Sequence, residues 1–170
     1  MEKIIEEIRD LIKSFCEEPV LNIGKIPQSG SIRIYFRILT AKRSFIATYG
    51  TNIRENEVFV YFSRHFKKFD CPVPEIYAVN KQETLYIQED FGDLSLLTKL
   101  EEHGYNPYVY SLFQKSLKAL AHLQIEGDKN LDYKFCLTSK EFGKQAILGD
   151  LLYFKYYFVD TLQIPYDKDQ

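Results

Sequence analysis

Three short runs of strand-forming residues follow one another between residues 21 and 49, and no other feature constrains the fold of this chain as strongly. The runs cover residues 21–26, 32–39 and 44–49, with the turn-like segments "PQSGS" and "TAKR" between them. Connections this short join antiparallel neighbours, because a parallel pair needs a crossover of about a dozen residues or more. The sequence therefore predicts a three-stranded antiparallel meander.

Helical periodicity on both sides of the meander completes the prediction of an α+β fold. Apolar residues recur at helical spacing near the N-terminus, which predicts an amphipathic helix of about 14 residues that ends near Pro19. A second predicted helix, over 53–69, starts at an Asn52 N-cap. Two further short strands, within 71–79 and 84–89, complete a predicted sheet of five antiparallel strands with one helix inserted after the third.

Beyond Gly92 the pattern predicts helices only. Asn106 and Pro107 supply an N-cap and a first-turn proline for one of them. Thr138 and Glu141 have the spacing of a capping box for the last one, which is dense in aromatic residues. The predicted helices cover residues 94–100, 107–125 and 138–162.

Charge and cysteine content exclude several classes of protein. With 22 Lys and Arg against 24 Asp and Glu in 170 residues, the formal charge of −2 gives no general attraction to nucleic acid or to anionic membranes, so any anion site has to be local. Cys16, Cys71 and Cys136 lie far apart, without the spacing of a zinc site or a disulfide framework. The sequence also lacks a signal peptide and an apolar run of about 18 residues. We therefore expect one globular unit in the cytoplasm.

The segment "QSGS" (28–31) lies between the first two predicted strands, where a Gly/Ser turn can bring backbone N–H groups to a phosphate. Alternation along the following strand places Arg33, Tyr35 and Arg37 on one face. Arginine matches phosphate oxygens in a bidentate way, so this face is a candidate nucleotide site. An ordinary hairpin turn beside two solvent-exposed arginines would give the same pattern, and both interpretations stay open.

Glu55 lies at the centre of the helical stripe formed by Phe59, Phe62 and Phe66. Its carboxylate is therefore expected to point towards the sheet, where a charge needs a partner. The alternative is that Glu55 only completes a capping box with Asn52.

The stretch "YIQEDFGDL" (86–94) contains the Asp-Phe-Gly sequence that holds Mg²⁺ in protein kinases, where it follows a His-Arg-Asp type of catalytic loop. In this sequence the residues two positions after the three histidines are Lys67, Tyr105 and Gln124, so none of them starts such a loop. Asp90 directly continues a strand and precedes the helices, which indicates a hinge and not a metal ligand. The backbone of an extended hinge can pair with adenine, and the alternative is a linker that binds nothing.

Five segments, in this order, resemble the aminoglycoside-phosphotransferase and choline-kinase superfamily. Within it they are most similar to the bacterial kinases of N-acetylmuramate or N-acetylglucosamine and to related phosphotransferases. The segments are "GSIRIYFRI", "GTNIRENEVFVYFSRHFKK", "CPVPEIYAV", "LYIQEDFGDLSL" and "ILGDLLYFKYYFVDTLQIPYD". The resemblance covers residues 21–167 and implies a protein-kinase-like fold. Its implied parts are an ATP-binding N-terminal lobe with a leading helix (1–89), a hinge (90–93) and the helical start of a C-terminal lobe (94–170).

The resemblance also implies roles for single residues. The turn before the second strand would cover the phosphates, Glu55 would be the helix glutamate, and the residues from Glu89 to Phe91 would form the hinge. The third strand lacks the lysine that most kinases use on the phosphates, so we expect Arg33 or Arg37 to take that charge role. The residues expected to contact the nucleotide are Ser29, Gly30, Ser31, Arg33, Arg37, Glu55, Glu89, Asp90 and Phe91.

The implied function is that of the nucleotide-binding part of an ATP-dependent small-molecule phosphotransferase. The full-length enzyme would use ATP with Mg²⁺ and a sugar or amino sugar as acceptor. The family's catalytic base and metal-binding residues lie beyond the aromatic helix, and this chain ends at Gln170 before any of them. Because phosphoryl transfer depends on positioning and on the metal, we expect these 170 residues alone to be inactive.

An alternative from a different class is a non-catalytic kinase-like module that associates through its aromatic C-terminal helix. The same helix favours a homodimer, because its aromatic residues lack the cover that a complete kinase-like fold would give them. A sheet that binds RNA through Arg33, Tyr35 and Arg37 is a weaker alternative, since the chain is net acidic and has no ribonucleoprotein motif. We expect neither nucleic acid nor a membrane as a partner.

Overall fold

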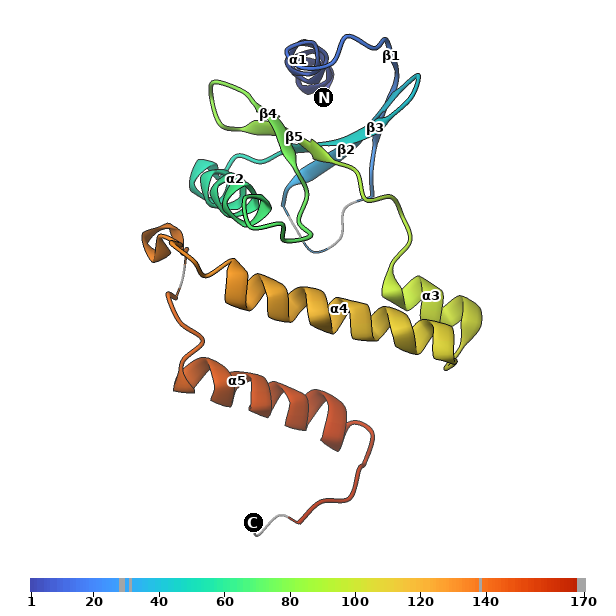
Figure 1. Ribbon diagram of the computed structural model, residues 1–170, viewed down its shortest axis with the longest axis vertical. Helices are drawn as coiled ribbons and strands as arrows, with labels where there is room; N and C mark the ends of the chain where they lie inside the picture. The colour runs from blue at the N-terminus through green and yellow to red at the C-terminus, as the bar shows by residue number, and fades with distance from the viewer. Residues whose placement is uncertain (28–29, 31, 138, 168–170) are drawn as a thin grey trace. The chain divides into compact units, whose positions relative to one another are not determined.

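Five strands form one antiparallel sheet in the computed structural model, which describes residues 1–27, 30, 32–137 and 139–167. The strands are β1 (Val20–Lys25), β2 (Ile34–Thr40), β3 (Ser44–Tyr49), β4 (Ile76–Val79) and β5 (Leu85–Glu89). Their order across the sheet is β1-β2-β3-β5-β4, so β5 is inserted between β3 and β4 (Figure 1). The predicted meander and the predicted α+β class are both confirmed.

Five α-helices accompany the sheet in the described residues: α1 (Glu2–Ile12), α2 (Ile53–Lys67), α3 (Leu96–His103), α4 (Pro107–Glu126) and α5 (Lys144–Phe154). Two predicted caps are confirmed. The Asn52 side chain accepts a hydrogen bond from the Glu55 N–H at 3.2 Å, and the Asn106 side chain accepts one from the Val109 N–H at 3.0 Å. Each satisfies a backbone donor that the first helical turn leaves without a partner.

The start predicted for the last helix is wrong, whereas the N-cap predicted for it, Thr138, lies outside the described residues. Glu141 precedes α5, which begins at Lys144 after Gly143. The hydroxyl of Ser139 donates to the Glu141 carbonyl and accepts from the Glu141 N–H. Hydrogen bonds from a serine side chain to the nearby backbone compete with helix formation, so the helix begins later in the sequence than predicted.

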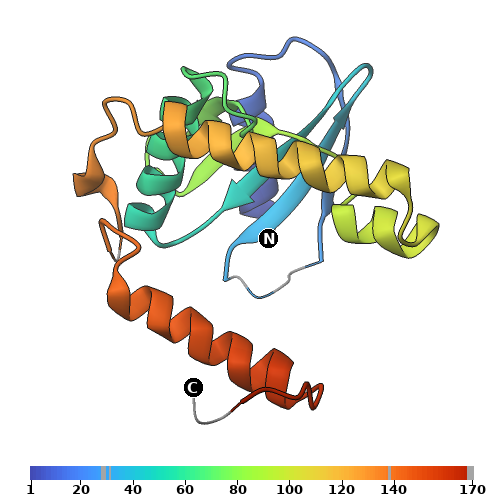
Figure 2. The same cartoon turned by 60° about the horizontal axis from the view of Figure 1, so that its bottom comes forward.

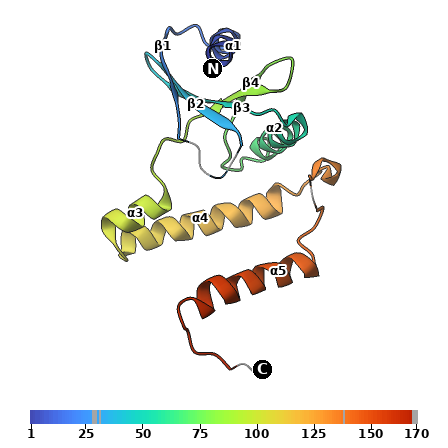
Figure 3. The ribbon, with the colours of Figure 1, turned by 180° about the vertical axis from the view of Figure 1, so that it is seen from behind.

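One face of the sheet packs against α1 and forms the main apolar core (Figures 1 and 3). Ile8 and Ile12 of α1 are fully buried there. The sheet side chains that meet them alternate along their strands and are Phe36, Ile38, Phe45, Ala47, Leu85 and Ile87. The residues between them therefore point to the opposite face, which is the face predicted to carry Arg37.

The opposite face of the sheet meets α2, where Phe59 stacks on Tyr86 with ring centroids 5.2 Å apart. Burial raises the pKa of Tyr86 to about 12, so its hydroxyl stays neutral. On a second side, α2 lies against the end of α4 (Figure 2). Nε2 of His65 on α2 lies 2.8 Å from the carbonyl oxygen of Gly127, the C-cap residue of α4.

Burial along α2 differs from the single phenylalanine stripe expected from the sequence. The most buried positions are Asn56, Val58, Val60, Ser63 and His65, whereas Phe59, Phe62, Phe66 and Phe69 are only partly buried. The difference arises because α2 is covered from two sides, by the sheet and by α4.

The chain divides into two compact units, Met1–Phe135 and Cys136–Gln170. The first contains the sheet, α1 to α4 and a short 3₁₀ helix (Tyr133–Phe135). The second contains α5 and a π-helical turn (Lys155–Asp160), in which the Lys155 ammonium pairs with the Asp160 carboxylate at 2.9 Å. In the described part of both units, no helix has the length and apolar character needed to cross a membrane.

Candidate functional site

Arg33 and Glu55 form an ion pair that joins the sheet to α2. Nη2 of Arg33 lies 2.8 Å from Oε1 of Glu55, and the two side chains are 12% and 32% exposed. The same nitrogen donates to the Glu55 carbonyl at 3.3 Å, and the guanidinium lies over the Phe59 ring at 5.5 Å. The partner expected for Glu55 is therefore present.

Gly30 belongs to the Gly/Ser turn that precedes Arg33. It has φ of +64°, a conformation that glycine adopts at no steric cost. A Cβ atom placed on Gly30 would have no neighbour within 4 Å among the described residues outside its two chain neighbours. Ser29 and Ser31, the other predicted members of the turn, lie outside the described residues.

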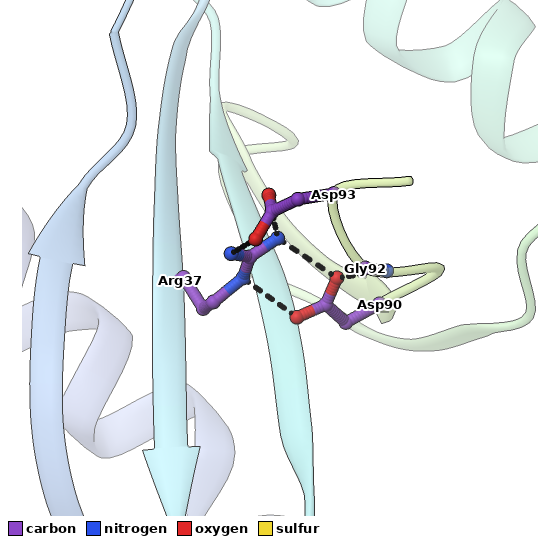
Figure 4. Close-up of polar contacts among 4 residues, drawn as sticks. All are labelled: Arg37, Asp90, Gly92 and Asp93. Carbon is purple, nitrogen blue, oxygen red and sulfur yellow. Dashed lines mark hydrogen bonds and ion pairs between the residues drawn. The ribbon is translucent and has the colours of Figure 1, made fainter. Parts of the chain in front are cut away.

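Arg37 is held by two carboxylates from the segment that follows β5 (Figure 4). Nε and Nη2 donate to the two oxygens of Asp90 at 2.8 and 3.2 Å. Nη1 and Nη2 donate to the two oxygens of Asp93 at 2.6 and 2.8 Å. Arg37 therefore ties the middle of β2 to the segment predicted as the hinge.

The two aspartates differ in their surroundings. Asp90 is 3% exposed and Asp93 is 78% exposed. Burial alone would raise the pKa of Asp90, but hydrogen bonds from the Gly92 N–H, the Ser44 hydroxyl and Arg37 outweigh it and lower that pKa below its ordinary 3.8. The hydrogen bonds from Arg37 also lower the pKa of Asp93, and together the two carboxylates raise the pKa of Arg37. All three groups are charged at neutral pH.

Asp90 and Asp93 thus serve as partners of an arginine. In the described parts of the chain, no group of three or more His, Cys, Asp or Glu side chains is arranged to hold a metal ion.

The remaining predicted hinge residues behave differently from one another. The Glu89 carboxylate accepts from the Lys67 ammonium and the Glu75 N–H, and the Glu89 N–H donates to the Glu75 carbonyl. Phe91 is 61% exposed, and within the described residues its N–H has no hydrogen-bond acceptor. Phe91 is therefore the hinge residue with both a free backbone donor and an exposed apolar side chain.

A cavity of about 310 Å³ lies beside this segment. Its lining comes from β1 and the residues after it, from Arg37 and Leu39 of β2, and from Asp93. The volume lies at the lower end of the range for small-molecule sites, about 300–1,000 Å³. The predicted site residues Arg37 and Asp90 are thus brought together next to a cavity, whereas Arg33 and Glu55 meet at the start of β2.

Two polar residues of this region were missed by sequence analysis. Asp93 could not have been paired with Arg37 from local pattern, because 56 positions separate them. Gln88 could have been found, since alternation along β5 places it on the same face as Tyr86, and register places it in one row with Arg37 and Ile46. Its Oε1 is buried and has no hydrogen-bond partner among the described residues.

Comparison with known proteins assigns no family. The sequence matches no protein-family model, and no curated protein matches it.

Proposed function

We propose that this chain is the nucleotide-binding part of an ATP-dependent small-molecule phosphotransferase. It comprises a kinase-like small lobe, a hinge at 90–93 and the first helices of the large lobe. The observation that carries the proposal is the ion pair between Arg33 and Glu55. It couples a helix glutamate to a cation at the start of β2. In protein kinases the helix glutamate pairs with a lysine of the third strand that contacts the phosphates, and we assign this charge role to Arg33, because the third strand of this chain has no lysine.

Arg33, and not Arg37, is the residue that we assign to the phosphates. Arg37 already makes four hydrogen bonds to Asp90 and Asp93. Its role in the proposal is to fix the hinge against β2. Arg33 lies three positions after Gly30, and in the proposal the Gly/Ser segment that contains Gly30 covers the phosphates.

The base of the nucleotide is assigned to the cavity between β1, β2 and the hinge. Phe91 and Gln88 do not line this cavity. In the proposal the Phe91 N–H of the adjoining hinge supplies a donor, and the buried Gln88 Oε1, in the same cross-strand row as Arg37, supplies an acceptor. A purine carries both kinds of group on its edges, so it can satisfy both. ATP with Mg²⁺ is the expected cofactor of the full-length enzyme, and we assign the metal to no residue of this chain.

The acceptor that we propose, a sugar or amino sugar, rests on the resemblance of the five sequence segments. The 170 residues alone are proposed to bind nucleotide without transferring phosphate, because neither a catalytic base nor a metal ligand is assigned within them.

Calorimetric titration of the purified chain with ATP tests the proposal. We expect saturable binding that Arg33→Ala weakens by about tenfold or more, because a charge-assisted contact to phosphate is lost. Arg9→Ala removes an exposed arginine from α1 and is the matched control, which should bind ATP as the unchanged protein does. Binding that is equally strong in all three proteins would refute the assignment of Arg33.

A second candidate function, a non-catalytic module that associates through its C-terminal helix, is favoured by the aromatic residues of the second unit. Tyr153 stacks on Tyr157 at 4.4 Å and Phe154 on Phe158 at 5.1 Å, and all four rings are 47–68% exposed. The two functions separate experimentally, because only the first requires that ATP binds and that binding depends on Arg33.

A further inference from the structure

A second cavity, of about 490 Å³, lies on the outer side of α2. Its walls come from α2, from Val79 and Glu83 of the hairpin between β4 and β5, and from Phe135 of the 3₁₀ helix. At 100° per residue, Glu57, Arg64 and Lys68 project from α2 about 180–220° away from Glu55. The cavity is therefore separate from the proposed nucleotide site and has no role in it.

The aromatic wall of this cavity is fixed by several contacts. The rings of Tyr61 and Phe135 stack at 3.9 Å with an angle of 11° between their planes. The Tyr61 hydroxyl accepts from the Asp132 N–H at 2.9 Å. Arg54 lies over the Phe135 ring at 5.4 Å and donates to the Lys134 carbonyl at 3.2 Å. Phe135 thus has Tyr61 stacked on one face and Arg54 over the ring, so a ligand would meet the edges of this aromatic pair. These groups are already in place, and a ligand would not have to order them.

The charges that border the cavity leave an excess of positive charge. Arg54 is neutralised by Glu57 at 3.5 Å. Arg64 on α2 and Lys68, the C-cap residue that follows it, are one helical turn apart. Both are exposed, and neither forms an ion pair within the described residues. Glu83 is the one other acidic residue in the lining, so the three remaining charges sum to +1.

We propose that this cavity binds a small aromatic anion, in which a ring carries a phosphate or a carboxylate group. The ring packs against the edges of the stacked Tyr61 and Phe135 rings, where an edge-to-face aromatic contact adds to the burial of apolar area. The anionic group is bound by Arg64 and Lys68, which supply the charge-assisted hydrogen bonds. Neither feature is sufficient alone, because exposed cations bind anions weakly and an aromatic wall has no preference for charge.

Titration of the ¹⁵N-labelled full chain with phenyl phosphate, benzoate and inorganic phosphate, followed by amide shifts, tests this proposal. We expect saturable shifts in α2 near Tyr61 and Arg64 and in the 3₁₀ helix with at least one of the two aromatic probes. Binding of both supports a general anion site, and binding of one identifies whether phosphate or carboxylate is preferred. Inorganic phosphate should bind at least about tenfold more weakly than the better aromatic probe.

The double variant Arg64→Ala/Lys68→Ala should lose at least about tenfold in affinity for that probe. Both positions are exposed, and unchanged amide positions elsewhere would show that the variant is folded. Lys115→Ala/Lys118→Ala removes two exposed lysines from α4 and is the matched control. The proposal is overturned if neither aromatic probe saturates at millimolar concentration, if inorganic phosphate binds as tightly as they do, or if the Arg64/Lys68 variant binds like the control.

Discussion

Arg33 and Glu55 are 22 positions apart in the chain, and their side chains meet at 2.8 Å. The contact joins the residue just before β2 to the first turn of α2, so it fixes how the helix is placed over the sheet. Because both side chains are partly shielded from water, the attraction between them is screened less than that of an exposed surface pair.

The pair should therefore show measurable coupling in a double-mutant cycle. We expect Arg33→Ala and Glu55→Ala each to lower the free energy of unfolding. The loss in the double variant should be about 1 kcal/mol smaller than the sum of the two single losses. Chemical denaturation of the four proteins measures this coupling. Strictly additive effects would contradict a direct interaction between the two side chains.

Asp90 should make the stability of the protein depend on pH in the acidic range. Its pKa is lower in the folded protein than its ordinary value of 3.8, so the unfolded chain takes up a proton first as the pH falls. The stabilisation is complete at neutral pH and is lost as the pH falls from about 5 through the lowered folded-state pKa.

Asp90→Asn should accordingly cost about 2 kcal/mol at pH 7 and progressively less towards pH 3. Denaturation midpoints of both proteins across this pH range give the difference. Asp10→Asn changes an exposed aspartate of α1 and is the control, with little effect expected at any pH. A difference between Asp90→Asn and the unchanged protein that does not vary with pH would be inconsistent with the ion pair to Arg37.

Gly127, at the end of α4, should not tolerate a side chain. A Cβ atom there would lie 2.8 Å from Cδ1 of Phe66 on α2 and against the Leu123 carbonyl oxygen. Gly127→Ala should therefore destabilise the first unit by about 1–3 kcal/mol, which is typical of overpacking. Gly149→Ala is the matched control, because nothing lies within 4 Å of its added methyl group in α5. Equal stability of the two variants would show that α2 and α4 do not pack this closely.

The sequence predicted those parts of the fold that depend on short-range pattern. β3 was expected at 44–49 and lies there, and the Asn52 and Asn106 caps form as predicted, because strand alternation and capping each involve a few neighbouring residues. The start of α5 was missed because the turn around Ser139 competes with helix formation.

Prediction of the candidate site was limited by long-range contacts. Arg37 was placed on the correct face by alternation, but its two partners lie 53 and 56 positions further along the chain. Nothing in the local sequence indicates that Arg37 is occupied by carboxylates while Arg33 pairs with α2. For the same reason, the contact between α2 and α4 and the resulting burial of His65 could not be anticipated.

Self-association through the C-terminal helices remains a prediction. Phe154, Tyr156, Tyr157 and Phe158 are 47–68% exposed, and apolar patches of this kind usually mark association sites. Burying part of them at about 25 cal/mol per Å² supports a dimer at micromolar concentration or above. Light scattering over a concentration series should show a mass that rises towards that of a dimer. A monomer mass at every concentration up to about 100 μM would exclude it.

The proposed nucleotide site is tested most directly by the amide spectrum of the ¹⁵N-labelled chain during titration with ATP. We predict saturable shifts that cluster at Gly30 and Arg33, at the hinge residues Phe91 and Gly92, and at Gln88, with no comparable shifts in α1. Arg33→Ala should reduce the affinity for ATP, while the other residues of this set still show the amide shifts. A spectrum that ATP leaves unchanged at millimolar concentration, or shifts that cluster away from the hinge and from the start of β2, would contradict the assignment of a nucleotide-binding lobe.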